Sequence, residues 1–121
     1  MYPVKIEPLD VELSVCKVTD YTQIDLEHSF VFTGSTDEEK SLVCPTDLVP
    51  ENILIREDGW RAFRISGQLD FSLVGILAQI SKTLADAGIG IFAVSTYNTD
   101  YILVKAENYS KALELLEQER E

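Results

Sequence analysis

The residues whose types and spacing could bind a small molecule gather around one loop and one hairpin. Gly67, Gln68 and Asp70 lie in a loop that leads into a helix, and Gly75 follows near the start of that helix. The first N–H groups of a helix have no partners within it, and together with the helix dipole they favour an anion such as a carboxylate. Gly67 and Gly75 carry no side chain that would block this approach.

Two carboxylates supply the opposite chemistry. Asp70 and Asp100 could accept charge-assisted hydrogen bonds from an ammonium or another cationic group. Together these groups predict a receptor for a zwitterion whose carboxylate lies at the helix start. Structural roles stay open for the same residues. Asp70 could cap the helix, Asp100 could stabilise a turn, and Gly75 could allow close packing of the helix on a strand.

The elements that position these residues are predicted from apolar spacing. A helix begins near Ser72, a suitable N-cap, and stops before Gly88, which supplies a left-handed end. Its buried stripe consists of Leu73, Ile76, Leu77, Ile80 and Leu84. A β-rich run from Ile89 and a strand over 101–104 then form a hairpin that turns at 98–100. A terminal helix after Asn108 buries Tyr109, Ala112, Leu113 and Leu116.

The first half of the chain predicts short strands. Residues 1–10 read as an extended lead-in, 11–18 as a strand, and 29–33 with 41–44 as a hairpin. The Glu-Asp-Gly at 57–59 predicts a turn between an apolar segment over 52–56 and a strand over 60–66. Cys16 and Cys44 lie in apolar runs, and we expect both to be buried, free thiols.

Composition argues against several functions. The chain has 10 basic and 21 acidic side chains and a net charge of −11, with no basic stripe for nucleic acid or an anionic membrane. It has no apolar run of about 18 residues and no signal peptide, so we expect a cytoplasmic protein. His28 is the single histidine, and no nucleophile, acid–base pair or metal-ligand set has suitable spacing. We therefore expect neither an enzyme nor a cofactor or metal site.

A faint internal repeat relates the two halves. Phe32–Cys44 resembles Phe92–Lys105, since each has a strand, a Ser-Thr pair, a polar turn with Asp and a returning Leu-Val strand. Any two hairpins can look alike, so chance similarity is the alternative. The second half reads β-α-β-β-α, a ferredoxin-like βαββαβ unit without its last strand. We expect a strand from residues 1–60 to fill that edge, and neither half to fold alone.

The run GILAQISKTLADAGIGIFAVSTYNTDYILV resembles the ACT domain, a ferredoxin-like regulatory module that binds amino acids. It is similar in particular to the tandem-ACT branch, which includes the cytosolic arginine sensor of animals and many small bacterial proteins. The resemblance is strong over 59–117 and weak over 1–58. It implies an α+β, ferredoxin-like βαββαβ fold in two copies that share strands, with a degenerate ACT-like half at 1–58 and an ACT domain at 59–121.

The resemblance also implies a ligand at an interface between two ACT units, near the loop before the first helix. Carried over by position, the ligand-binding residues are Gly67, Gln68, Asp70, Leu73, Val74, Gly75, Thr96, Tyr97 and Asp100. The N-terminal half lacks a long first helix and a glycine-bearing loop, so we expect a second chain to complete the pocket.

The sequence thus predicts a non-catalytic regulatory module, a homodimer that binds an amino acid and reports to a protein partner. Acidic residues at the site and the resemblance to the arginine sensor favour a basic amino acid. The alternative is a ligand-free module for dimerisation or protein–protein interaction through a strand edge or helix faces.

Overall fold

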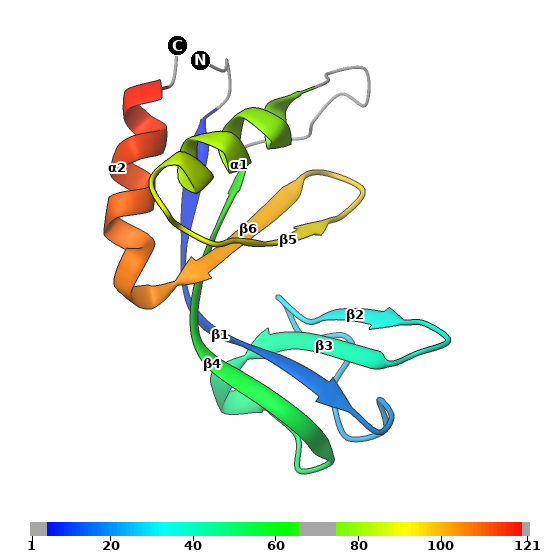
Figure 1. Ribbon diagram of the computed structural model, residues 1–121. Helices are drawn as coiled ribbons and strands as arrows, with labels where there is room; N and C mark the ends of the chain where they lie inside the picture. Colours follow the sequence, from blue (N-terminus) through cyan, green and yellow to red (C-terminus); the bar gives the residue numbers. More distant parts are fainter. Residues whose placement is uncertain (1–4, 66–74, 120–121) are drawn as a thin grey trace. The chain divides into compact units, whose positions relative to one another are not determined.

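The computed structural model describes residues 5–65 and 75–119, and the chain divides into two compact units (Figure 1). Unit 1 takes the chain up to Asp10 and from Arg61 onward, and unit 2 takes Val11–Trp60. Two long strands, β1 (Ile6–Val18) and β4 (Ile53–Ile65), contribute residues to both units.

Unit 1 combines strands with two helices. Its other elements are α1 (Ile76–Asp86), β5 (Phe92–Ser95), β6 (Asp100–Lys105), the 3-10 helix η2 (Ala106–Asn108) and α2 (Tyr109–Glu119). Its strands follow the order β1-β4-β6-β5. Glu7 contacts Arg64 and Leu9 contacts Arg61, so β1 and β4 run antiparallel, because the residue number rises along one strand as it falls along the other.

The core of unit 1 lies between its strands and its helices. Figure 1 shows α1 and α2 on the same face of the strands. Phe63, Ile80 and Leu116 are fully buried in this core, and each large apolar side chain contributes about 1.5–3 kcal/mol when buried. Within the described residues, the predicted helix stripes pack in this core, with Leu77 and Leu113 half-buried at its margin. The stripe residues that are buried are Ile76, Ile80 and Leu84 on α1 and Tyr109, Ala112 and Leu116 on α2.

The sequence predicted the C-terminal end of α1 correctly but not its start. At its C-terminus, Gly88 has a φ of 75°, its N–H donates to Ala85 O, and the N–H of Ile89 donates to Leu84 O, both at 2.9 Å. This pair of bonds is a Schellman motif, so the predicted left-handed stop is confirmed. The predicted start near Ser72 is wrong, because α1 begins at Ile76. Gly75 precedes it with a φ of 84°, a left-handed backbone that a helix does not pass through.

Unit 2, all of whose residues are described, contains no α-helix. It adds β2 (Phe32–Ser35), β3 (Lys40–Pro45) and the 3-10 helix η1 (Thr46–Leu48), with the strand order β2-β3-β1-β4. β1 pairs antiparallel with β3, from Leu13 opposite Pro45 to Val18 opposite Lys40. The face with Cys16 and Leu42 is covered by Tyr21, Ile24, Val31, Val49 and Ile53. Loop residues together with Ile53 of β4 therefore cover this face, whereas helices cover the strands of unit 1.

Three boundaries predicted in the first half are wrong. The segment 57–59 is not a turn, because β4 continues through Gly59, which has a φ of 84°. A glycine with this backbone inside a strand is typical of a bulge. β1 begins at Ile6 and passes through Pro8, which is tolerated because β1 is an edge strand of unit 1. β2 begins at Phe32 rather than at Ser29.

The two hairpins have matching lengths and spacing. β5 begins 60 residues after β2 (92 − 32), and β6 begins 60 residues after β3 (100 − 40). In the turns, Thr36 N donates to Glu39 O and Thr96 N donates to Thr99 O, each at 2.9 Å. The hydroxyls of the same two threonines donate to the same carbonyls. The turns therefore share one hydrogen-bond pattern although their sequences differ.

Over the part of the chain that the structure describes, neither helix has the length and apolar character needed to cross a bilayer.

Candidate functional site

The nine predicted ligand-binding residues fall into two groups. The first lies outside the described residues and consists of Gly67, Gln68, Asp70, Leu73 and Val74. The second belongs to unit 1 and consists of Gly75, Thr96, Tyr97 and Asp100. Of the segment predicted to hold a ligand, the structure describes the two flanking residues, Ile65 and Gly75.

The start of α1 offers hydrogen-bond donors. Within the described residues no side chain caps this helix, and its first turn holds no acidic residue. Gly75 O accepts from Gln79 N at 2.9 Å, so the helical bonding begins there. The N–H groups of the first turn point out of the helix end and carry the positive end of its dipole. This arrangement suits an anionic group of a ligand.

The turn of the β5–β6 hairpin lies beside the base of the loop. The hydroxyl of Thr99, a residue only 6% exposed, donates to Ile65 O at 3.0 Å. Ile65 is the last described residue before the loop and Gly75 is the first after it. Thr96 closes the turn by donating to Thr99 O at 3.0 Å. The predicted hairpin residues are therefore anchored to the chain where the loop begins.

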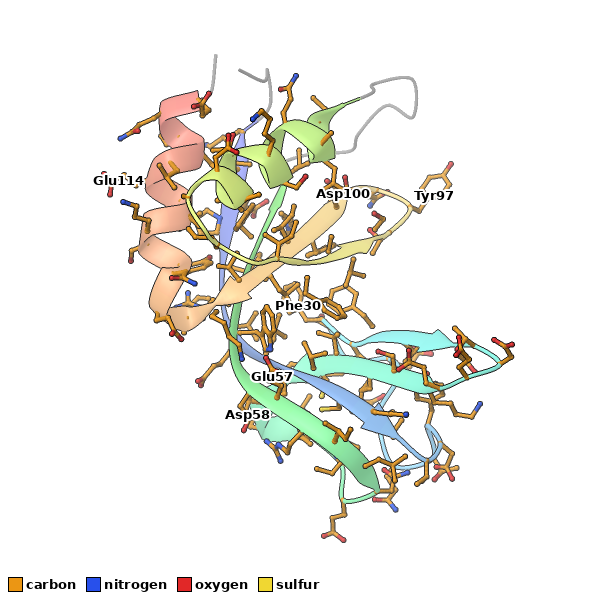
Figure 2. The ribbon with its side chains drawn as sticks, viewed as in Figure 1. Phe30, Glu57, Asp58, Tyr97, Asp100 and Glu114 are labelled. Carbon is orange, nitrogen blue, oxygen red and sulfur yellow. The ribbon has the colours of Figure 1, made fainter. Side chains whose placement is uncertain are left out.

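Asp100 and Tyr97 occupy this hairpin end, as Figure 2 shows. Ser95 Oγ donates to Asp100 Oδ1 at 2.6 Å, so Asp100 contributes to the turn. A carboxylate accepts several hydrogen bonds, and one such bond leaves capacity for a cationic ligand group. Tyr97 is 74% exposed. The arrangement accommodates both roles that the sequence left open for Asp100.

An ion pair between Arg64 and Glu7 on the strands of unit 1 was not predicted. Arg64 donates to Glu7 through Nε at 3.1 Å and Nη2 at 3.2 Å, and through Nη1 to the Tyr101 hydroxyl at 3.2 Å. The hydrogen bond from Arg64 holds the pKa of the Glu7 carboxyl below its usual range. Both groups therefore stay charged at neutral pH. Only the register between β1 and β4 could have revealed this pair, since it joins residues 57 positions apart.

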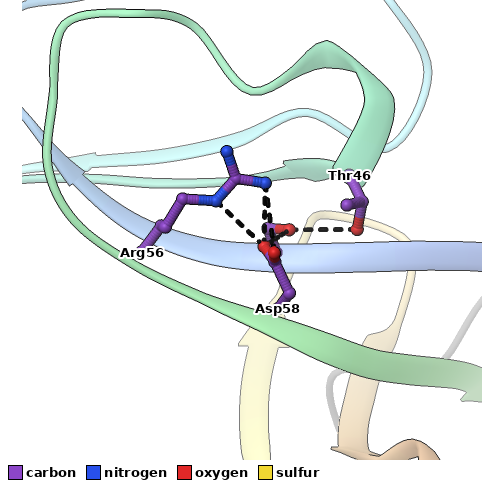
Figure 3. Close-up of polar contacts among 4 residues, drawn as sticks. Thr46, Arg56 and Asp58 are labelled. Atoms are coloured by element: carbon purple, nitrogen blue, oxygen red, sulfur yellow. Dashed lines mark hydrogen bonds and ion pairs between the residues drawn. The ribbon is translucent and has the colours of Figure 1, made fainter.

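A second unpredicted network lies in unit 2 (Figure 3). Ser14 is fully buried, and its Oγ donates to Asp58 Oδ1 at 2.5 Å and lies 3.0 Å from Thr46 Oγ1. A hydroxyl has one proton, so donation to Asp58 leaves Ser14 to accept from Thr46. Arg56 Nε and Nη2 also bind Asp58 Oδ1, at 3.1 and 3.0 Å. This network ties β1, β4 and η1 together and holds the Arg56 charge next to a carboxylate.

The two cysteines are free and buried, which confirms the prediction. They lie on β1 and β3 in the same apolar cluster. The hydrogen bond with Cys16, together with burial, raises the pKa of the Cys44 thiol. Among residues 5–65 and 75–119, no group of three or more His, Cys, Asp or Glu side chains is arranged to hold a metal ion.

Two hollows lie away from the predicted residues. One, of about 440 Å³, lies between α1 and α2 and is lined by Gln79, Lys82, Thr83, Asp86, Ala87, Leu115 and Glu119. The other, of about 310 Å³, belongs to unit 2 and is lined by Lys17, Val18, Thr19, residues 36–40 and Leu54. Neither of these two is lined by Gly75, Thr96, Tyr97 or Asp100.

Comparison with known families gives the class of the protein. The ACT domain profile matches residues 55–118, more than half of the chain. This match agrees with the strand order and the two helices of unit 1. The chain belongs to the ACT domain family, a family of regulatory modules with an antiparallel sheet and two helices.

Among characterised relatives, the human protein named cytosolic arginine sensor for mTORC1 subunit 1 is 38% identical over 88 residues. The match covers 70% of this chain and 26% of the sensor. The Bos taurus protein of the same name is 36% identical over the same length. The chain therefore spans about a quarter of the length of these relatives.

Solved structures share the fold over nearly the whole chain. A protein of Agrobacterium tumefaciens has a TM-score of 0.83 and 29% identity, over 98% of this chain and 90% of that one. The ligand-free regulatory subunit of aspartate kinase from Thermus thermophilus has a TM-score of 0.68 over 97% of this chain and 98% of that one. Its identity is 12%, so it shows a common fold alone.

Proposed function

We propose that this chain is a non-catalytic regulatory module that binds an amino acid at an interface between ACT units. The observation that carries the proposal is the start of α1, which follows left-handed Gly75 and is capped by no side chain of the described residues, in a chain of the ACT family. The N–H groups of its first turn suit the α-carboxylate of an amino acid. A second copy of the chain completes the pocket, because unit 2 has no helix that could supply an equivalent helix start.

A basic amino acid fits the acidic groups of the predicted site. Asp100 retains acceptor capacity beyond its bond with Ser95, and Asp70 lies in the loop sequence between the described ends. The name of the related arginine sensors favours the same ligand class. Because this chain matches only a quarter of the sensor, the ligand of the sensor supports the proposal without establishing it.

The proposal includes a duplicated architecture, with a degenerate first copy at 1–58 and an ACT domain at 59–121. The equal spacing of the hairpins and their common turn bonds support it. In this arrangement the start of β1 serves as the last strand of the second copy, and the start of β4 serves as the last strand of the first. The strand orders of the two units are consistent with that exchange.

A thermal-shift screen of the full chain with each of the twenty amino acids tests this function, followed by calorimetry on any that act. Arginine or lysine should raise the melting temperature, because a ligand at about 100 times its dissociation constant stabilises the folded state by ~2.7 kcal/mol. D100N should weaken binding of that ligand about tenfold or more, because a hydrogen bond to a charged group contributes about 1.5–3 kcal/mol.

The matched control is E114Q, which makes the same charge change on an exposed face of α2 (Figure 2). It should leave the affinity unchanged within error. If none of the twenty amino acids shifts the melting temperature or gives heat, the amino-acid proposal is wrong. A dimer that forms without any ligand, measured by sedimentation, would then favour the alternative of a pairing module.

A further inference from the structure

The formal charge of the chain is concentrated in unit 2. Residues 11–60 hold 11 acidic and 3 basic side chains, a net charge of 3 − 11 = −8. Unit 1 holds 10 acidic and 7 basic side chains, a net charge of 7 − 10 = −3 over a longer sequence. A unit with this excess of one sign attracts partners of the opposite sign and repels a copy of itself.

Unit 2 also ends in an edge strand. β4 lies between β1 and β6 in the sheet, but β6 belongs to unit 1 and begins beside Ile65, at the far end of β4, so the first part of β4 is an edge of unit 2. Edge strands are usually guarded by proline, by a bulge or by charged side chains. At the start of β4 three apolar residues follow one another, Ile53, Leu54 and Ile55. We call this segment the 53–55 edge.

The backbone of the 53–55 edge points outward at two residues. Asn52 O accepts from Thr19 N, just beyond the end of β1, at 3.2 Å, so the backbone groups of Asn52 face β1. Backbone groups alternate sides along a strand, and the N–H and C=O of Ile53 and Ile55 therefore face away from β1. They can pair with one further strand.

Two of the three side chains of the 53–55 edge are exposed, whereas Ile53 packs against the apolar cluster around Cys16. Leu54 is 58% exposed and Ile55 is 65% exposed. Of the four large apolar side chains that are exposed among the described residues, three belong to unit 2, the third being Leu26. Acidic residues bracket the edge, since Glu51 precedes it and Glu57 follows it, both exposed. Arg56 lies between them, but its guanidinium binds Asp58 through two nitrogens.

We propose that the 53–55 edge is a docking site for an extended, basic polypeptide segment of another protein, which adds as a strand to β4. The backbone of the segment would pair with Ile53 and Ile55. Its apolar side chains would pack on Leu54 on one face of the sheet, and its lysines or arginines would lie on the other face, near Glu51 and Glu57. Strand addition gives affinity through the main chain and specificity through alternate side chains.

Charge distinguishes this occupant from a second copy of the chain. Pairing two 53–55 edges would bring together two units of net charge −8, with Glu51 and Glu57 of each copy close to those of the other. A basic segment relieves the same repulsion. The docking site therefore favours a positively charged partner, and its affinity should fall as salt screens the charges.

The test is a titration of the ¹⁵N-labelled full chain with an eight-residue peptide of alternating Lys and Val, capped at both ends. Binding should be saturable, with chemical-shift changes confined to residues 51–57 and their β1 neighbours. The same peptide N-methylated at every residue has no backbone N–H to donate on either edge and should not bind. A Glu-Val peptide of the same length should not bind either, because of its charge.

Protein variants separate the edge from the general surface. L54S should weaken binding at least threefold, whereas L26S, which removes an equally exposed leucine, should not. E51Q/E57Q should weaken binding about fivefold, from two ion pairs of roughly 0.5 kcal/mol each. The control E107Q/E114Q, with the same charge change in unit 1, should weaken it less than twofold.

Four outcomes would overturn the proposal: no binding up to the solubility of the peptide, shifts that map outside residues 51–57 and β1, equal effects of L54S and L26S, or full binding by the N-methylated peptide. Concentration-dependent dimerisation of the chain with amide protection at 53–55 would identify a second copy as the occupant, and would overturn it too.

Discussion

At the scale of single residues, the ion pair between Arg64 and Glu7 can be tested through the pH dependence of stability. Arg64 binds Glu7 with two hydrogen bonds, and the pair joins two neighbouring strands of unit 1 that lie far apart in sequence. The side chain of Glu7 is 44% exposed, so solvent screens the interaction. Removing the interaction should therefore change how the unfolding free energy depends on pH more than it changes the stability at neutral pH.

The pKa of Glu7 is lower in the folded chain than in the unfolded one, mainly because of its hydrogen bond with Arg64. Its stabilising contribution is therefore fully present above the unfolded value, near pH 4.3, and is lost as the pH falls through the folded value. We expect E7Q to reduce the acid-induced loss of unfolding free energy below about pH 4.5. Urea unfolding of both proteins between pH 3 and 7 measures it.

E12Q is the control, because Glu12 is an exposed carboxylate on the same strand. The unfolding free energy of E12Q should fall with decreasing pH in the same way as that of the unmodified chain. If E7Q and E12Q give the same curves, the Arg64–Glu7 bonds make no contribution in solution.

At the scale of elements, the end of α1 is determined by one backbone conformation. Gly88 has a φ of 75°, and a side chain there would meet open space, so the cost of substitution is conformational. G88A should reduce the free energy of unfolding by about 1–2 kcal/mol, the cost of a left-handed backbone for a residue with a Cβ. Urea unfolding should show a lower midpoint with an unchanged slope.

Gly90 offers a matched control two residues further on. A Cβ at this position would also meet open space, but the φ of Gly90 is not positive. G90A should therefore be neutral or stabilising by up to ~1 kcal/mol, because alanine restricts the unfolded chain. Equal losses from G88A and G90A would contradict the conformational explanation.

The elements that the sequence predicted well are those determined by local periodicity. The stripe Ile76, Ile80 and Leu84 repeats at helical spacing, and its burial follows from that alone. Gly59 shows the limit of local signals. Glu-Asp-Gly is typical of a turn, yet this glycine lies inside β4, because the strand continues along β1 on both sides of it. The pairing partner overrides the local preference.

The polar networks of the structure could be predicted only in part, for a physical reason. Residue type and position in the ACT pattern assign Gly75 and Asp100 to the candidate site, and their contact with a ligand stays a prediction. The networks around Arg64 and Ser14 were not predicted, because the first joins residues 57 positions apart and the second residues 44 apart. Such pairs depend on the register between β1 and β4, and alternation within one strand does not determine which residue lies opposite.

At the scale of the whole molecule, each unit depends on a strand that begins or ends in the other part of the sequence. Unit 1 takes the start of β1 beside β4, and Leu9 exchanges hydrogen bonds with the Tyr109 hydroxyl of α2 and with Arg61. Ile6 joins the helical core of the same unit. A fragment that begins at Arg61 would lose both residues and expose one side of β4.

This dependence predicts the behaviour of two fragments. Residues 61–121 alone should give no cooperative thermal transition, because β4 would become an unprotected edge and Tyr109 would lose one of its buried partners.

A permuted chain, with residues 5–10 joined after residue 121 by a Gly-Ser linker, restores the order βαββαβ. The start of β1 and the end of α2 lie at the same end of unit 1 (Figure 1), and a linker of about eight residues spans up to ~26 Å. The permuted chain should therefore unfold cooperatively. Circular dichroism melting curves and dispersed amide spectra distinguish the two fragments. If 61–121 alone melts as sharply as the permuted chain, the first strand is not required for the fold of unit 1, and strand exchange between the units has no energetic consequence.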